Sequence, residues 1–241
     1  MGFRCVHCGF EVRALFIQYS PGNIRLTKCG RCGAVADEYV ECEYMILLID
    51  LILHKAKAYR HLLYNFPNRN VVNLEGILWK SAFFFLVIDT CRELAVNKIQ
   101  EGLGSSASSS ASPCTCGKLL MNVFLGNFIF LGALLLGTKI LQKSSSEILR
   151  FKEVLLAIIV SSYFKIFLIT MMIWEFPLSV LFIIDLFVLS SNAVALKVLT
   201  NATTNGCIGV CLTAHAAKYF VSHMKVVLGL GFLRCLGLIS C

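Results

Sequence analysis

The stretch that decides the fold contains two short cysteine motifs, Cys5-Val6-His7-Cys8-Gly9 and Cys29-Gly30-Arg31-Cys32-Gly33. Twenty residues separate the two motifs' inner cysteines, which is close to the spacing of two thiol pairs that share one zinc ion. Four thiolates fill a tetrahedral site and leave no position for a catalytic water, so the predicted zinc is structural. We predict zinc bound by four residues, with two disulfides or free thiols as the alternative; these residues are Cys5, Cys8, Cys29 and Cys32.

The segment between the two motifs is predicted to form two short strands. Residues 11–18 alternate polar and apolar side chains, and residues 23–28 follow a turn at Ser20-Pro21-Gly22-Asn23. A stretch this small buries little apolar surface, so metal binding, on the order of 10–16 kcal/mol in zinc-finger peptides, would supply its folding energy. Together these features predict a zinc ribbon.

Basic residues within the ribbon allow two interpretations. Such ribbons can bind nucleic acid, but a solvated basic face toward anionic lipid headgroups is the reading favoured by the apolar remainder of the chain. We therefore expect no nucleic-acid partner. The basic residues are Arg13, Arg25, Lys28 and Arg31.

An apolar segment of ten residues, Tyr44–Leu53, follows the ribbon. At 1.5 Å per residue it is too short to cross the roughly 30 Å hydrocarbon core of a bilayer. We predict a helix at the membrane interface, or a core helix packed on the ribbon, and one helix can do both with different faces. A cationic cluster that follows suits contact with the cytosolic leaflet, through Lys55, Lys57, Arg60 and His61.

The composition indicates an integral membrane protein. Of 241 residues, 57% are hydrophobic, and the mean hydropathy is +0.76, which is too apolar for an ordinary soluble protein. The formal net charge is +8. On a membrane protein such an excess more often reflects residues beside anionic lipid than nucleic-acid binding.

The predicted fold is a small N-terminal zinc ribbon with short β-strands and an interfacial helix, followed by an all-α polytopic membrane bundle of at least four transmembrane helices. The ribbon domain covers residues 1–65, and a turn-rich linker covers residues 66–76. Residues 102–113 form a Ser-rich loop, and the apolar tail 206–241 holds one or two further membrane segments or an interfacial helix. Within the bundle at 77–199, spans are predicted at about 77–96, 121–141, 154–174 and 178–199.

The orientation follows from the zinc site and from one loop. Thiolate zinc sites without disulfides suit the reducing cytosol. Lys143, Arg150 and Lys152 lie between the second and third spans, in a loop predicted to share that side of the membrane. We therefore expect a cytosolic N-terminus.

Three ionisable residues inside the predicted spans form a possible intramembrane polar site: Asp89, Lys165 and Asp185. The third and fourth spans are predicted to form a hairpin that places Lys165 and Asp185 at similar depth, where an ion pair offsets a cost of about 2.5 to 3.5 kcal/mol for each charge. Such groups line a polar path or lipid headgroup site, or they fix helix register. For Lys165 and Asp185 we favour the second interpretation, in which the ion pair fixes the register of the helices.

Several sequence blocks carry a resemblance to a known family. Tyr19–Leu26 leads into the second cysteine motif, Ala36–Glu41 follows it, and Ile49–Lys55 precedes Tyr59–Leu62. In this order and spacing they resemble the homology domain of the Arv family, polytopic endoplasmic-reticulum proteins implicated in sterol and sphingolipid homeostasis. The membrane part is similar at Ser161–Leu168, Trp174–Pro177 and Ser191–Val198.

The resemblance implies a multi-pass protein of the endoplasmic-reticulum membrane that mediates sterol homeostasis and intracellular transport of sterols and other lipids, and that also affects sphingolipid metabolism. Its expected partners are membrane lipids, above all sterols. The alternative is a zinc-ribbon adaptor that recruits lipid-synthesising membrane enzymes and moves nothing itself.

Catalytic motifs are not evident. The sequence contains no His-Glu-x-x-His, Gly-x-Ser-x-Gly, phosphate loop or dinucleotide fingerprint, so we predict that the protein is not an enzyme. A lipid-modifying membrane enzyme is the least favoured alternative, and it would depend on a polar residue such as His215 or Asp89.

Overall fold

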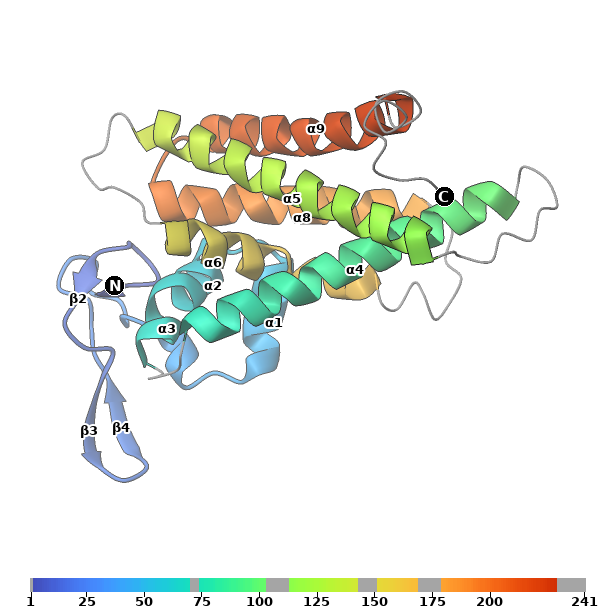
Figure 1. The fold of residues 1–241 in the computed structure, drawn as a ribbon. Coiled ribbons are helices and arrows are strands. Elements are labelled where there is room, and N and C mark those ends of the chain that lie inside the picture. Colours follow the sequence, from blue (N-terminus) through green and yellow to red (C-terminus); the bar gives the residue numbers. More distant parts are fainter. Residues whose placement is uncertain (1, 70–73, 103–112, 143–150, 169–178, 229–241) are drawn as a thin grey trace.

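The computed structural model describes residues 2–69, 74–102, 113–142, 151–168 and 179–228. A small N-terminal domain of short strands and short helices lies beside a set of long helices that run alongside one another (Figure 1). The long helices are α4 (Leu74–Gly102), α5 (Pro113–Gln142), α8 (Ser179–Thr200) and α9 (Thr204–Leu228).

The strands form two antiparallel pairs. β1 (Phe3–Arg4) pairs with β2 (Glu11–Val12), and β3 (Phe16–Ser20) pairs with β4 (Asn23–Leu26). The turn of the second pair needs Gly22, whose φ of 84° is in the left-handed region that side chains disfavour. The second predicted strand is present as β4, whereas the first, residues 11–18, is divided between β2 and β3, which pair with different partners. The β3–β4 hairpin projects away from the helices (Figure 1).

Short helices complete the N-terminal domain. An apolar stretch forms α1 as predicted, and a basic segment that follows forms α2, which continues as a π-helical turn into α3. The bounds are η1 (Glu38–Val40), α1 (Tyr44–Ile52), α2 (Ala56–Arg60), η2 (His61–Asn65) and α3 (Phe66–Arg69).

One apolar core extends from the N-terminal domain into the bundle. Val6 and Tyr59 from the domain belong to the same buried cluster as Val154 of α6 (Phe151–Ser161) and Val198 of α8. Burial of a side chain of this kind is worth about 1.5–3 kcal/mol. The domain is therefore packed on the bundle and not merely tethered to it.

Two segments are long and apolar enough to cross a membrane, judged by length and composition: Leu119–Leu141 in α5, and the whole of α8. Both coincide with predicted spans. In the ranges that the structure describes, neither α4 nor α9 meets the same criterion, although both have the length. The expected total of at least four spans therefore remains a prediction.

The third predicted span is not one continuous helix. Helix α6 (Phe151–Ser161) ends inside the expected range 154–174, and a 3-10 turn, η3 (Tyr163–Ile166), follows it. At the break, the Ser161 hydroxyl donates to the carbonyl of Ile158. Serine side chains compete with helical backbone hydrogen bonds in this way and favour bends, so two adjacent serines are a physical reason for the break.

Other predicted features lie partly outside the described residues. The linker 66–76 begins as helix α3, and its residues 70–73 are not described. Of the Ser-rich loop 102–113, only the ends are described, as the last residue of α4 and the first of α5. The tail 206–241 is described as far as Leu228, where α9 packs along α5.

Candidate functional site

The four cysteines of the two motifs lie together and can hold one metal ion. All four sulfur atoms lie within 4.8 Å of one another. Cys5 Sγ is 3.7 Å from Cys32 Sγ, and Cys8 Sγ is 3.6 Å from Cys29 Sγ. A tetrahedral zinc with Zn–S bonds of about 2.3 Å requires sulfur separations of about 3.8 Å, so the cluster fits zinc.

Each motif folds into the same tight turn, which is what aims its two sulfurs at one point. The amide of Gly9 donates to the carbonyl of Cys5 at 2.9 Å, and the amide of Gly33 donates to the carbonyl of Cys29 at 2.9 Å. Both glycines have positive φ, 75° and 72°, a conformation that costs a residue with a Cβ. The glycine after each cysteine pair is therefore part of the metal site.

The surroundings of the thiols bear on their protonation. Backbone hydrogen bonds from Cys32 and Arg31 lower the pKa of the Cys29 thiol to about 6. Burial raises the pKa of the Cys5 thiol to about 12, so this group takes up the charged form only with a cation beside it. A metal ion is the cation that lets all four cysteines be thiolates together.

A buried carboxylate ties the cluster's domain to the helices that follow it. Asp37, which is fully buried, accepts hydrogen bonds from His61 Nδ1 at 2.7 Å and from Asn65 Nδ2 at 2.7 Å. Asn65 also exchanges two hydrogen bonds of 2.8 Å with the backbone of Arg4. The start of the chain is thereby fixed to the π-helical turn η2.

This arrangement corrects the prediction that His61 contacts the membrane surface. The side chain of His61 is buried, because Asp37 draws it into the interior of the domain. Arg60 is also engaged inside the domain, where its Nη1 donates to the carbonyls of Val6 and His7 at 2.8 Å. Its guanidinium thus clamps the first cysteine motif.

The two lysines of the predicted surface cluster remain near the surface. Lys55 Nζ pairs with Asp50 Oδ1 at 2.7 Å, and Lys57 Nζ pairs with Glu38 Oε1 at 3.2 Å. Exposed pairs of this kind are weak, so both lysines are able to meet anionic headgroups. The prediction for these two residues is untested by the geometry.

Helix α1 presents large apolar side chains to the outside. Tyr44 is 85% exposed and Met45 is 62% exposed, while Leu51 of the same helix is buried in the core. The helix therefore has one face on the domain and another that is uncovered within the described residues, as expected for an interfacial helix that also packs on the ribbon. The remaining exposed apolar residues of this segment are Ile46, Leu48, Ile49 and Leu53.

Polar contacts join the N-terminal domain to α8. The hydroxyls of Tyr59 and Ser191 lie 2.7 Å apart in a buried position. His54 Nε2 lies 2.9 Å from the Ser190 hydroxyl, and its ring packs on Phe187. Since α8 is a candidate membrane span, the domain reaches along the side of a helix that is apolar enough for lipid.

A second candidate site lies inside the bundle around Asp89 of α4. Its Oδ2 accepts from Lys165 Nζ at 3.0 Å, from Lys218 Nζ at 3.2 Å and from Asn127 Nδ2 at 3.1 Å. Lys218 also donates to Asn127 Oδ1 at 2.7 Å. The elements α4, α5, η3 and α9 thus meet at one buried carboxylate.

The predicted pairing of Lys165 with Asp185 is wrong. Asp185 instead forms a bidentate ion pair with Arg92, at 2.9 and 2.6 Å, and accepts from the Tyr219 hydroxyl at 2.6 Å. The prediction assumed one straight helix through Lys165, whereas α6 ends at Ser161. All three predicted intramembrane residues nevertheless belong to one region, linked through Asp89 and Arg92 one turn apart on α4.

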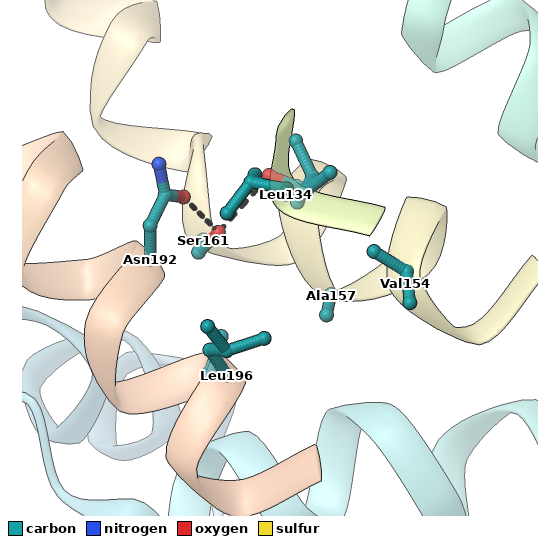
Figure 2. Close-up of a pocket in the computed structure, with 8 residues that line it drawn as sticks. Leu134, Val154, Ala157, Ser161, Asn192 and Leu196 are labelled. Atoms are coloured by element: carbon teal, nitrogen blue, oxygen red, sulfur yellow. Dashed lines mark hydrogen bonds between the residues drawn. The ribbon is translucent and has the colours of Figure 1, made fainter. Parts of the chain in front are cut away.

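A third group of polar side chains, Ser161, Asn192 and His215, is linked by close contacts and borders a small cavity. The Ser161 hydroxyl, which also contacts the carbonyl of Ile158, lies within hydrogen-bonding distance of the side-chain carbonyl of Asn192, whose amide lies 3.2 Å from His215 Nε2. Figure 2 shows Ser161 and Asn192 pointing toward each other from two helices. The cavity has about 10 Å³ of room for the centre of a water molecule, roughly one water. Its lining is otherwise apolar, from Leu134, Val154, Ala157, Ile158, Ala195 and Leu196.

Sequence reasoning missed several residues of these sites. Asp37 and Asn65 lie in or beside blocks of the family resemblance, but a buried role is not readable from their spacing. In the sequence, Arg92 is a charged residue within the first predicted span, and Lys218 is one basic residue in the apolar tail. A charged side chain in an apolar segment was the available signal, since such groups pair within a bundle.

The fold and its sites define a class: a membrane-associated protein whose N-terminal domain, packed on a helical bundle, contains a cysteine cluster that can hold a metal ion. Residues 4–196 match the model of the Arv1-like family, and the chain belongs to this family. The resemblance drawn from the sequence blocks is thereby confirmed. Membership supports a role in the family's lipid homeostasis.

Relatives carry the family name in plants and animals. The chain is 50% identical over 222 residues to Protein ARV 1 of Arabidopsis thaliana, covering 92% of this chain and 88% of that protein. It is 31% identical over 212 residues to Protein ARV1 of Homo sapiens, covering 83% of this chain and 73% of that protein. No solved structure matches this chain.

Proposed function

We propose that this protein mediates sterol homeostasis by moving sterols, and with them other lipids, out of the endoplasmic-reticulum membrane, with an effect on sphingolipid metabolism. The observation that carries the proposal is the match to the Arv1-like family over residues 4–196. The proposal includes a multi-pass topology with a cytosolic N-terminus, and it includes no catalytic step.

In this mechanism the N-terminal domain docks on the cytosolic leaflet. The exposed apolar side chains of α1 enter the interfacial region, and Lys55 and Lys57 meet the anionic headgroups. Zinc acts as a structural ion: held by the four cysteines, it stabilises the domain that presents α1. The apolar helices α5 and α8 supply the path along which a lipid moves.

The proposal is tested by sterol binding and by sterol transfer between vesicles with the purified full-length protein. We expect saturable transfer by the wild type. Lys165→Ala, which removes one ion pair of Asp89, is expected to lose transfer while the protein stays folded. Lys197→Ala is the matched control, because Lys197 is an exposed lysine in the last turn of α8. A zinc-loaded, folded wild type that neither binds nor transfers sterol rules out transport.

The docking step has its own test. Ile49, which is 51% exposed on α1, is changed to Asn, and binding to vesicles that contain anionic lipid is compared with the wild type. We expect weaker vesicle binding and reduced sterol transfer. The zinc content should be unchanged, because only the outward face of the helix is altered. Unchanged transfer and unchanged vesicle binding would remove α1 from the mechanism.

The second candidate function is an adaptor that recruits lipid-synthesising membrane enzymes. The β3–β4 hairpin favours it, because the hairpin projects from the molecule (Figure 1) and exposes Ile17 and Tyr19. Two results together support the adaptor over the transporter. The protein is inert in the transfer assay but co-purifies with a lipid-synthesising enzyme, and Tyr19→Ser abolishes this co-purification.

A further inference from the structure

The charged residues inside the bundle do not balance. Within the part of the chain that the structure describes, the hydrogen-bonded cluster holds two carboxylates, Asp89 and Asp185, and three cations, Arg92, Lys165 and Lys218. Arg92 takes both oxygens of Asp185, and the two lysines share the single Oδ2 atom of Asp89. The cluster therefore carries one positive charge in excess, which is costly away from water.

Nearby charges do not supply the missing anion among the described residues. Glu93 lies one turn beyond Asp89 on α4, but it forms no ion pair there. Asn127, the other partner of Lys218, is neutral. A lysine that is held by one shared oxygen and one amide retains capacity for an anionic acceptor, because an ammonium has three donors.

Two buried atoms of the cluster also lack a hydrogen-bond partner among the described residues: Asp89 Oδ1 and Arg92 Nε. They belong to residues three apart on α4, and so to adjacent positions on one helix face. Burial of an unpaired polar group costs about 1–3 kcal/mol, more when it is charged. The cluster therefore has both an unused acceptor and an unused donor, in addition to its excess charge.

The edge of the cluster reaches the surface of the bundle, while Asp89 itself is buried. The side chains of Lys218 and Asp185 are 24% and 26% exposed, and Tyr219 beside them is exposed. Asp185 lies six residues into α8, about 9 Å from the start of that helix. Ser191, which meets the N-terminal domain, lies six residues further along the same helix. At this depth a lipid headgroup is within reach.

We propose that this cluster binds the headgroup of an anionic phospholipid. The phosphate accepts hydrogen bonds from Lys218 and Arg92 and neutralises the excess charge, and a headgroup hydroxyl donates to Asp89 Oδ1. Phosphate prefers such a set of ammonium and guanidinium donors. The inference rests on the membrane placement in the proposed function, and it holds whether or not the protein transfers sterol.

The test measures lipid binding by the full-length protein, purified in detergent and titrated with phosphatidylglycerol or phosphatidylcholine, by native mass spectrometry. The wild type is expected to prefer phosphatidylglycerol. Lys218→Met should lower that affinity about tenfold, the loss of a charged hydrogen bond in a poorly solvated site. Lys218→Arg should retain most of it. Lys197→Met, at the other end of the bundle, should leave it unchanged.

Asn127→Asp is a second variant of nearly the same side-chain size, in which a carboxylate oxygen replaces the amide that donates to Asp89 Oδ2. It places a carboxylate 2.7 Å from Lys218, neutralises the excess charge and removes the need for a lipid phosphate. We expect it to lose the preference for phosphatidylglycerol even if Lys218→Met fails to fold. Inorganic phosphate is added as a competitor: displacement of the lipid would assign the site to free phosphate.

Two further results overturn the proposal. In one, folded Lys218→Met and Asn127→Asp bind phosphatidylglycerol as the wild type does. In the other, Lys197→Met lowers binding as much as Lys218→Met, which would mean that general attraction by basic residues is measured. Failure of sterol transfer with the phosphatidylglycerol preference intact overturns the proposed function alone.

Discussion

The N-terminal domain and the helical bundle both bury a carboxylate, but they recruit its partners differently. Asp37 of the domain is held by His61 and Asn65, which lie 24 and 28 residues away in sequence. Asp89 of the bundle is held by Lys165 and Lys218, which lie 76 and 129 residues away. The partners of Asp37 lie within the same N-terminal domain. The partners of Asp89, including Asn127, come together only when four separate elements pack.

The stability of the two regions should therefore depend on different interactions. The domain is organised around a metal-binding cluster and short-range contacts, so its stability should depend on local chemistry. The bundle is organised around a charged cluster that no single helix contains, so its stability should depend on assembly. Four substitutions test this difference, and they follow from the largest expected effect to the smallest.

Cys29→Ser should have the largest effect. It removes one of four ligands, and metal binding of this kind is worth on the order of 10–16 kcal/mol, as much as the whole stability of a typical domain. We expect loss of bound zinc and rapid proteolysis within residues 1–65. Zinc content and limited proteolysis measure this outcome. Cys42→Ser, at a free cysteine outside the cluster, is the control and should leave both unchanged.

Asp89→Asn should destabilise the bundle by about 3–5 kcal/mol, because it leaves buried cations without their carboxylate. Chemical unfolding of the detergent-solubilised protein measures the change. Glu93→Gln, one turn further along α4, is the matched control and should cost little. Equal effects of the two variants would mean that charge on α4, rather than this cluster, matters. The zinc content should be unaffected, which separates the two regions.

Tyr59→Phe tests the contact between the regions. It deletes a buried hydrogen bond to Ser191 of α8 and should cost about 1 kcal/mol. Hydrogen exchange should increase in α8 around Ser191 and in α2, and not in the cysteine motifs. Tyr19→Phe, on the exposed hairpin, is the control. Unchanged exchange in α8 would show that the domain does not depend on this contact.

Lys55→Met should have the smallest effect, below about 1 kcal/mol, because the pair with Asp50 is half exposed. Hydrogen bonds from Lys55 and then from Tyr39 lower the pKa of Asp50 below its ordinary 3.8. A lowered folded-state pKa contributes stability above the ordinary value, which is lost as the pH falls through the folded one. The variant should therefore differ from the wild type at neutral pH and converge with it in acid. A difference that persists in acid would contradict this account.

Much of the N-terminal domain could be predicted from the sequence. Two cysteine pairs with a glycine after each determine where the chain must turn, and the structure brings the four sulfurs together. The strands on either side of Gly22 and the helix α1 also follow from local patterns. His61 was misplaced on the surface, because nothing in its neighbourhood indicates that Asp37 lies beneath it.

Less of the bundle could be predicted. Hydropathy located α5 and α8, since an apolar run is a property of the segment alone. It did not show that α6 ends at Ser161, where a side chain competes with the helix backbone. The error carried over to Lys165, whose expected partner was derived from a straight helix.

By itself the sequence determined the four cysteines that lie together, the apolar helices and the family, because each depends on residues close together or on an ordered set of blocks. Only the tertiary structure decided which charges share Asp89, that Arg92 pairs with Asp185, and that the domain rests on α8 through Tyr59. The physical reason is that a buried charge is satisfied by whichever opposite charge packing brings within about 4 Å, and sequence separation places no limit on that choice.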